Sequence, residues 1–211
     1  MLDEKNQIDD ATFMTARARF DAYAGMDGPK LPNDERSALQ VRLGRWQTRE
    51  FGPVSTERCA LGVGEEVGEL AEAYDAALSG VIVSGEYRSR ALDAVADICI
   101  YATNLCTGLR LDFWALNHVG FEMDMARVVV RSAAAAGRLQ HAVLKSAQGI
   151  RGMHDPEKYR RAAASAVHGL VREMSSACYM FGADLETVVT EVAEEVMKRT
   201  WKKWPETGGA A

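Results

Sequence analysis

The chain has 211 residues, is 47% hydrophobic and carries a formal net charge of −5, which allows one large domain or two small ones with an ordinary core. The acidic balance argues against a general nucleic-acid binder, which would carry a basic face. No apolar run reaches the roughly 18–20 residues of a membrane span, and the N-terminus lacks a signal-peptide pattern. The four cysteines form no CxxC pair and are expected to be reduced core residues. We therefore expect a cytoplasmic protein that binds neither nucleic acid nor membranes.

Apolar residues recur at helical spacing along almost the whole chain, and no convincing alternating strand interrupts them. The glycine-flanked string SGVIVSG is expected to connect two helices rather than to form a strand. Gly120 is a candidate break in the longest helical stretch. The sequence thus predicts an all-α bundle. The predicted helices cover residues 11–23, 36–51, 55–79, 86–107, 112–150, 156–181 and 184–202.

The third predicted helix carries a dense run of carboxylates among small residues, GEEVGELAEAYDAA. Residues three or four apart share one face of a helix, so Glu66 and Glu69 form an acidic pair, as do Glu65 and Glu69. The fourth predicted helix adds Asp93 and Asp97, four residues apart and surrounded by Ala, Val and Ile. We therefore expect two buried acidic pairs on adjacent antiparallel helices.

Two such pairs cannot all stay ionised in an interior without compensation, and neither motif contains Lys or Arg. A hard divalent cation would compensate them, and oxygen-only ligands suit Mg²⁺ or Mn²⁺. The alternative is an ordinary solvated glutamate-rich face, which fits Glu72 and Asp75. A di-iron carboxylate bundle uses Glu-x-x-His motifs. None of the four histidines has a glutamate three residues before it, so such a site is disfavoured.

These motifs resemble those of the MazG-like all-α nucleoside triphosphate pyrophosphohydrolases, a superfamily that includes dimeric dUTPases, dCTP pyrophosphatases and phosphoribosyl-ATP pyrophosphatases. Its signature is E-E-x-x-E on one helix and E-x-x-D on the next. The first part is matched by Glu65, Glu66 and Glu69, and the final aspartate by Asp97.

One position departs from that signature. Ala94 stands three residues before Asp97, and the acid is Asp93 instead, a D-x-x-x-D spacing that is similar to phage-type members. The segments HAVLKSAQGIRG and VMKRTWKKWPETGG also resemble phage and actinobacterial relatives, so the likeness covers about residues 37–208. If the chain is phage-encoded, its expected location is the host cytoplasm.

The resemblance implies hydrolysis of a (deoxy)nucleoside triphosphate to the monophosphate and pyrophosphate, with Mg²⁺ or Mn²⁺ as the cofactor. Metal ions would be held by Glu66, Glu69, Asp93 and Asp97 and would stabilise charge on the α-phosphoryl group. Glu65, on a neighbouring face of the helix, would orient or deprotonate the attacking water.

Several polar or aromatic residues are candidates for substrate binding. Tyr101 and Asn104 lie one and two turns beyond the last acid, within reach of sugar or base. For Trp46, stacking on the base and ordinary core packing both stay open, and for the basic residues helix-surface solvation is the alternative. The full candidate set is Trp46, Tyr101, Asn104, Lys145 and Arg151, with Lys198 and Arg199 as further candidates for the phosphate tail.

An internal repeat is indicated by GELAEAYDAALSG (68–80), which aligns without gaps on GRLQHAVLKSAQG (137–149), and by GLRLDFWAL, which resembles GADLETVV. In this alignment the three glutamates of the first copy correspond to Ala134, Ala135 and Arg138, so the second copy has lost its acids. The resulting units are an N-terminal extension (1–35), a MazG-like catalytic unit (36–124) and a degenerate second unit packed on it (125–211).

Two functions of different classes remain. The first is a metal-dependent pyrophosphohydrolase that controls nucleotide pools, with a lean toward a purine substrate such as (d)GTP. The second is a non-catalytic nucleotide-binding or interaction protein on the same helical bundle. The intact acids of the first copy favour the enzyme, and association into a homodimer or higher homo-oligomer is expected.

Overall fold

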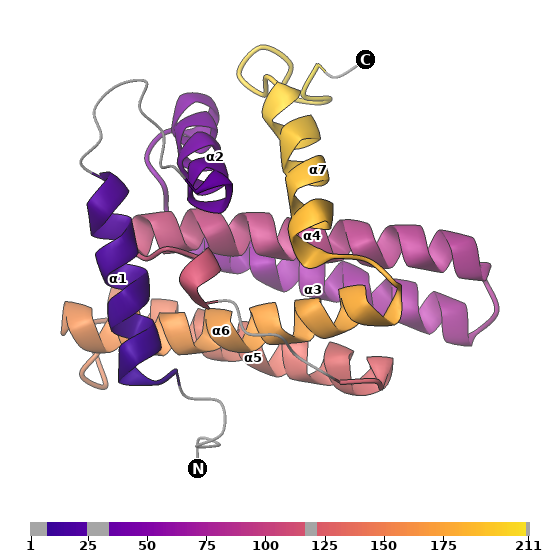
Figure 1. Cartoon of the computed structure of the whole chain (residues 1–211), viewed down its shortest axis with the longest axis horizontal. Coiled ribbons are helices and arrows are strands. Elements are labelled where there is room, and N and C mark those ends of the chain that lie inside the picture. Colours follow the sequence, from indigo (N-terminus) through magenta and orange to yellow (C-terminus); the bar gives the residue numbers. More distant parts are fainter. Residues whose placement is uncertain (1–7, 25–33, 117–121, 210–211) are drawn as a thin grey trace.

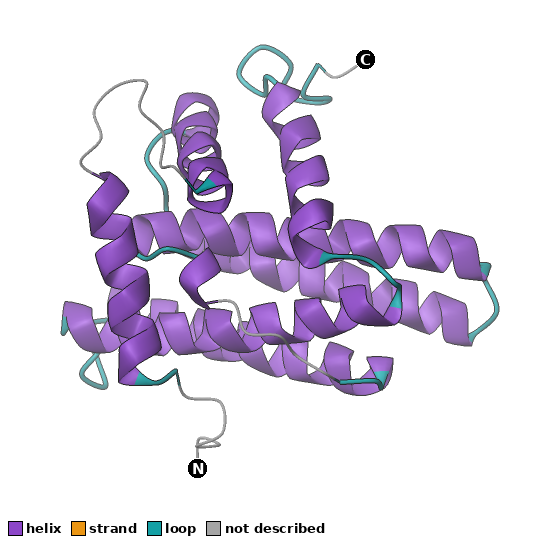
Figure 2. Ribbon diagram, viewed as in Figure 1, coloured by secondary structure: helices purple, strands orange, loops and turns teal. Residues whose placement is uncertain are grey.

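The computed structural model describes residues 8–24, 34–116 and 122–209. Over these residues the chain forms seven α-helices, one short 3-10 helix and no strand, so the expected all-α fold is confirmed (Figure 2). The segment 79–85 contains the connector between two helices, as predicted. The elements are α1 (Asp10–Ala24), α2 (Glu35–Phe51), α3 (Thr56–Leu78), α4 (Ser84–Leu109), η2 (Trp114–Leu116), α5 (Met125–Ala147), α6 (Pro156–Met180) and α7 (Leu185–Lys198).

Six of the helices begin at a side-chain cap. In each, the oxygen of an Asp or Ser accepts a hydrogen bond from a backbone N–H two or three residues further on, which satisfies a donor that the helix itself leaves unpaired. Such residues end one element and start the next, and apart from α5 they mark helix starts that the sequence predicts closely. The caps are Asp9, Asp34, Ser55, Asp124, Asp155 and Asp184.

The helix predicted over 112–150 is wrong at its beginning. Arg110 closes α4 in the left-handed conformation, with φ 58°, and Asp112 then accepts a hydrogen bond from the backbone N–H of Trp114 at 3.0 Å. This side-chain bond competes with helix formation, and the Asp112 carboxylate is fixed further by Arg19 at 2.8 Å and the Ser37 hydroxyl at 3.0 Å. The proposed break at Gly120 lies outside the described residues.

The last predicted helix also ends earlier than residue 202. α7 stops at Lys198 because Arg199 is extended, with ψ 142°. Residues 200–209 then fold back in turns, in which the Thr200 N–H donates to the Gly208 carbonyl at 2.7 Å. This C-terminal segment, residues 199–209, turns back beside α2 (Figure 1).

Two helical hairpins make up the body of the molecule. Helices α3 and α4 form the first hairpin and α5 and α6 the second, with α5 against α3 and α6 against α4 (Figure 1). Helices α2 and α7 pack on α4 from the side opposite the second hairpin, and α1 crosses one end near η2. None of the helices in the described ranges is long and apolar enough to cross a bilayer.

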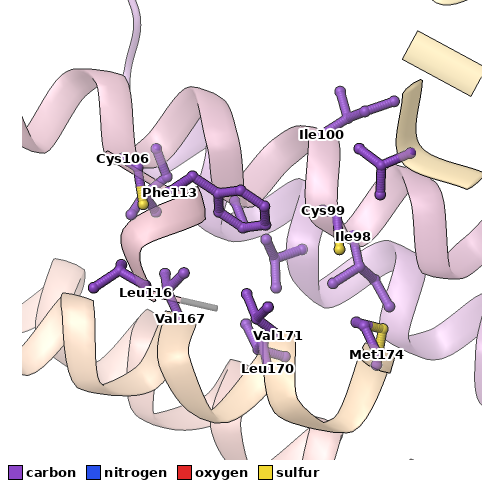
Figure 3. Close-up of a cluster of buried hydrophobic side chains, with 14 of the residues drawn as sticks. Ile98, Cys99, Ile100, Cys106, Phe113, Leu116, Val167, Leu170, Val171 and Met174 are labelled. Carbon is purple, nitrogen blue, oxygen red and sulfur yellow. The ribbon is translucent and has the colours of Figure 1, made fainter. Parts of the chain in front are cut away.

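The core lies between the two hairpins. Ile98 and Cys99 of α4 face Leu170, Val171 and Met174 of α6 there (Figure 3). The four cysteines are all free and buried, as expected for small core residues. Helix α1 belongs to the same core, since its Phe13 and Ala16 are fully buried.

The first helices of the two hairpins end alike. Helices α3 and α5 each have 23 residues, and their ends keep a constant offset of 69 positions, from Gly80 to Gly149. Both glycines have positive φ, 67° and 65°. Their N–H groups donate to the backbone carbonyls of Ala77 and Ser146 at 3.1 and 3.0 Å, and these two acceptors show the same offset.

The second helices of the hairpins also end alike. Arg110, directly after α4, and Gly182, two residues after the end of α6, are both left-handed, with φ 58° and 63°. One residue further on, Leu111 and Ala183 donate their N–H groups to the carbonyls of Cys106 and Cys178, both at 2.9 Å. These pairs keep an offset of 72 positions, since the connector inside the second hairpin is three residues longer.

Candidate functional site

The register of the first hairpin is set by Gly62 of α3, which lies under the ring of Tyr101 on α4. A Cβ atom added at Gly62 would lie 2.5 Å from Tyr101 Cε1, so only glycine lets the ring come this close. Because the helices are antiparallel, one turn forward on α3 and one turn back on α4 bring Glu66 opposite Asp97. The two halves of the acidic motif therefore meet.

The five carboxylates of the motif differ in their burial. Glu66 is only 8% exposed and Asp97 is half-buried, whereas Glu65, Glu69 and Asp93 are exposed. The expectation of two buried acidic pairs is therefore wrong. The motif follows the edge of the hairpin, so that one acid of each helix turns inward and its neighbours turn to solvent.

Glu66 is the most perturbed carboxyl of the site. Burial, which disfavours the ionised form, raises its pKa to about 8, and the negative charges of Asp97, Glu69, Glu65 and Asp93 add to this effect in that order. At neutral pH this carboxyl therefore keeps its proton in a substantial fraction of molecules. A cation next to it would reverse the shift.

Asp97 shows the same behaviour to a smaller extent. Its pKa rises to about 6 because of burial and the neighbouring charges of Asp93 and Glu69, while the positive charge of Arg199 lowers it. Arg199 begins the C-terminal segment, so that segment supplies a cation which neither acidic motif contains. Within the described residues, none of the five carboxylates accepts a hydrogen bond or forms an ion pair.

The donor chemistry of this cluster suits a hard cation, because every candidate ligand is a carboxylate oxygen. The side chains do not yet converge: no group of three or more His, Cys, Asp or Glu in the described ranges is arranged to hold a metal ion. Like charges repel one another, and a bound cation would offset this repulsion. To reach a cation between Glu66 and Asp97, the exposed side chains of Glu69 and Asp93 would have to rotate.

Two predicted substrate residues continue the stripe along α4. Tyr101 is half-buried, and burial together with the charges of Glu66 and Glu65 raises the pKa of its phenol. Asn104 is 2% exposed, and its Oδ1 has no hydrogen-bond partner among the described residues. A buried amide oxygen without a partner is costly, so Asn104 has an unused capacity to accept a hydrogen bond.

Trp46 packs in the core in this conformation. Its side chain is 6% exposed, its ring meets Phe51 edge-on at 5.6 Å between centroids, and its indole N–H donates to the Arg199 carbonyl at 3.2 Å. This arrangement favours the packing alternative over base stacking. Trp46 thereby ties α2 to the C-terminal segment.

The predicted phosphate-binding residues of the second half lie in the last turn of α5 and in the connector to α6. The Lys145 ammonium donates to the Gln148 side chain at 2.8 Å, and Arg151 is exposed in a left-handed turn, with φ 57°. Neither is among the groups that shift the pKa values of Glu66 and Asp97. Among the described residues, Arg199 is the one basic residue that lowers the pKa of Asp97, and no basic residue shifts the pKa of Glu66.

The second hairpin holds small residues where the first holds acids. Ala135 of α5 lies 3.7 Å from the position of a Cβ atom at Gly169 of α6, and these positions correspond to Glu66 and Asp97 at the two offsets given above. Arg138 corresponds to Glu69, and its Nη2 lies 3.4 Å from the position of a Cβ atom at Gly169. The second hairpin therefore brings Ala135 and Gly169 together as the first brings Glu66 and Asp97 together, but it has no acids at these positions.

A second polar cluster was missed by sequence reasoning. Glu173 of α6 is 1% exposed and accepts hydrogen bonds from Arg172 at 2.7 and 3.1 Å. The signal was present, since an Arg-Glu pair interrupts the apolar stripe between Val171 and Met174. Adjacent charged residues are unusual on a helix that faces the core.

A comparison of the chain with protein families, curated proteins and solved structures finds no match.

Proposed function

We propose that this protein hydrolyses a (deoxy)nucleoside triphosphate to the monophosphate and pyrophosphate with the help of Mg²⁺ or Mn²⁺, as its resemblance to the MazG-like pyrophosphohydrolases suggests. The observation that carries this proposal is the meeting of Glu66 and Asp97 across α3 and α4, with raised pKa values and no ion-pair partner in the described ranges. Acids arranged in this way cost folding free energy, so a role in cation binding accounts for their presence.

In this proposal Glu66, Glu69, Asp93 and Asp97 hold the metal, which would neutralise the triphosphate and polarise the α-phosphoryl group. Glu65 is exposed on the neighbouring face of α3 and orients or deprotonates the attacking water. The buried Glu66 would lose its proton on cation binding at neutral pH, because a neighbouring positive charge stabilises its ionised form.

The substrate would lie along α4 from the acids toward Asn104. The unpartnered Asn104 Oδ1 can accept an N–H from the base, and Tyr101 borders the sugar. Arg199 is better placed for the phosphates than Lys145 or Arg151, since its charge already acts on Asp97. The Asn104 amide acceptor keeps the lean toward a purine such as (d)GTP.

We further propose that the two hairpins are copies of one MazG-like unit and that the second copy has lost its acids. The matching ends of α3 and α5 and of α4 and α6 support this relationship. The degenerate copy would then cover the first one within a single chain. Pairing of chains stays a prediction, for which the exposed Val130 and Leu144 of α5 offer an apolar surface.

The direct test is release of pyrophosphate from a panel of purine and pyrimidine dNTPs with Mg²⁺, and again with EDTA. The proposal requires metal-dependent formation of monophosphate and pyrophosphate. Orthophosphate with the diphosphate as products would contradict the assigned bond. No turnover of any member of the panel would contradict the enzyme.

One observation favours the second candidate, a non-catalytic nucleotide-binding or interaction protein. The carboxylates do not converge into a preformed metal site. Binding of a nonhydrolysable dNTP without any turnover of the natural nucleotides would decide for this candidate.

A further inference from the structure

The second hairpin contains a polar cavity that lies outside the acidic site. Its volume is about 200 Å³, and it is lined by Glu122, Arg131, Arg172, Glu173 and Ser176. This is smaller than the roughly 300–1,000 Å³ of pockets for drug-sized ligands. Every lining side chain among the described residues is polar, and none of them is an aromatic ring that could stack on a base.

The deepest group of the cavity has an unmet hydrogen-bonding capacity. Glu173 is 1% exposed. Its Oε1 accepts from Arg172 at 2.7 Å, but its Oε2 has no hydrogen-bond partner in the described part of the chain. A buried carboxylate oxygen without a hydrogen bond costs free energy. We therefore expect this atom to accept a hydrogen bond from a donor outside the protein.

The other lining groups are hydrogen-bonded to one another. The Arg131 guanidinium donates to Glu122 at 2.7 Å, and the Glu122 backbone N–H donates to the Ser176 hydroxyl at 3.1 Å. Arg131 is 45% exposed in its side chain, whereas Arg172 is 29% exposed. The cavity therefore opens to solvent beside Arg131 and has Glu173 at its base.

The charges of the lining restrict the ligand. Two arginines and two glutamates make the cavity neutral as a whole. A pure anion such as phosphate would meet the two carboxylates, and a pure cation would meet the two guanidinium groups. A small molecule that carries both an ammonium and a carboxylate avoids both conflicts, since its ammonium can donate to Glu173 Oε2 and its carboxylate can accept from arginine.

We infer that this cavity binds a small zwitterion, of the chemical class of free amino acids, with its ammonium group on Glu173 and its carboxylate on the arginine side. The site lies in the hairpin that lacks the acidic motif, so it is separate from the proposed catalytic function and does not depend on it. It gives the second hairpin a ligand of its own.

The test is calorimetric titration of the full chain with glycine, β-alanine and γ-aminobutyrate, which differ in the spacing of their two charges. Methylamine and acetate are the single-charge controls. At least one zwitterion should bind saturably, at least tenfold more tightly than either control. Saturable binding of none of them would mean that the cavity holds water only, and equal binding of methylamine or acetate would equally overturn the assignment.

Two variants locate the ligand. Glu173→Gln removes the charged acceptor and should weaken zwitterion binding at least about tenfold, as expected for a hydrogen bond to a charged group. Arg131→Met alters the half-exposed mouth without touching the core and should also weaken it. Arg90→Met, which removes an exposed arginine paired with Glu86 on α4, is the matched control.

If Glu173→Gln does not fold, the Arg131→Met result decides alone. Unchanged affinity in Arg131→Met, or an equal loss in Arg90→Met, would move the ligand elsewhere and defeat the inference. Because the readout is amino-acid binding, failure here leaves nucleotide hydrolysis untouched, and the reverse is also true.

Discussion

At the scale of single residues, Glu66 is where folding and the proposed chemistry compete. Its carboxyl lies inside a hairpin, faces Asp97 and lacks an ion-pair partner among the described residues. Ionisation of such a group costs free energy that folding must supply. A purely structural residue at this position would be apolar, as Ala135 is at the corresponding position of the second hairpin.

The raised pKa of Glu66 gives the metal-free protein a defined pH dependence. The folded carboxyl titrates near pH 8 and the unfolded one near 4.5, so the folded state binds more protons between these values. The free energy of unfolding should therefore fall as pH rises through this window, by at most about 5 kcal/mol at roughly 1.4 kcal/mol per pKa unit. Asp97 adds to the fall between about pH 3.8 and 6.

This prediction is checked by urea unfolding at several pH values in the presence of EDTA. Glu66→Gln should flatten the decline and raise the stability at pH 8. Glu72→Gln, at an exposed position on the same helix, is the control and should change neither. A Glu66→Gln variant that keeps the full pH slope would show that this carboxyl is not the cause.

Asp97 carries the second residue-scale prediction. Asp97→Asn keeps the shape of the side chain and removes the charge that the proposed metal site needs, so pyrophosphate release should fall by roughly 10²-fold or more. Stability should hold or rise, since a repelling carboxylate is removed. Asp75→Asn is the control, because Asp75 is exposed near the end of α3. Near-normal turnover of Asp97→Asn would place the site elsewhere.

At the scale of helices, the close approach of α3 and α4 depends on Gly62. In Gly62→Ala the new methyl group would lie 2.5 Å from Tyr101 Cε1, and other atoms of the ring would be within 2.6 Å. The ring or the helix must shift, at a cost of about 1–3 kcal/mol. The facing of Glu66 and Asp97 changes with it, so activity should fall as well.

Gly68 provides a matched comparison on the same helix. A Cβ atom there meets no described atom within 4 Å, so Gly68→Ala should stabilise the protein by up to about 1 kcal/mol through helix propensity alone. Urea unfolding of the two variants tests the pair. Equal effects of the two substitutions would mean that the contact between Gly62 and Tyr101 does not set the hairpin.

The helices themselves were predictable because their signals are local. The 3.6-residue period and the caps mark their extent, and the same period brought Glu66 and Asp97 onto facing sides.

The exposure of Asp93 was not predictable, because it depends on where the other helices pack on α4. Arg199 lies about a hundred residues from Asp97 in the chain, and its effect on the site appears only once α7 is in place. The turn at Asp112 was missed because Arg19 and Ser37, which hold it, come from two other segments.

At the scale of the whole molecule, the two hairpins share a register and differ in chemistry. The contact between α3 and α5 includes Gln140, whose amide donates to the Ala60 carbonyl at 3.2 Å and whose side chain lies over Gly64. A side chain on Gly64 would collide with Gln140, so this contact requires glycine at that position. The second hairpin thus completes the core of the first, while Ala135 and Gly169 leave it without carboxylates at the positions of Glu66 and Asp97.

A chain built in this way should contain one active site. Titration with a nonhydrolysable dNTP in the presence of Mg²⁺ should saturate at one ligand per chain, and Asp97→Asn should abolish turnover rather than halve it, because the second hairpin has no acids to replace those of the first. A fragment that ends at Asp124 should lose activity, since it exposes the side of α3 that α5 covers and lacks Arg199. Circular dichroism shows whether the fragment folds, and if it does not, the stoichiometry of the full chain decides. Two ligands per chain, or an active fragment, would mean that the second hairpin neither lost a site nor completes the first.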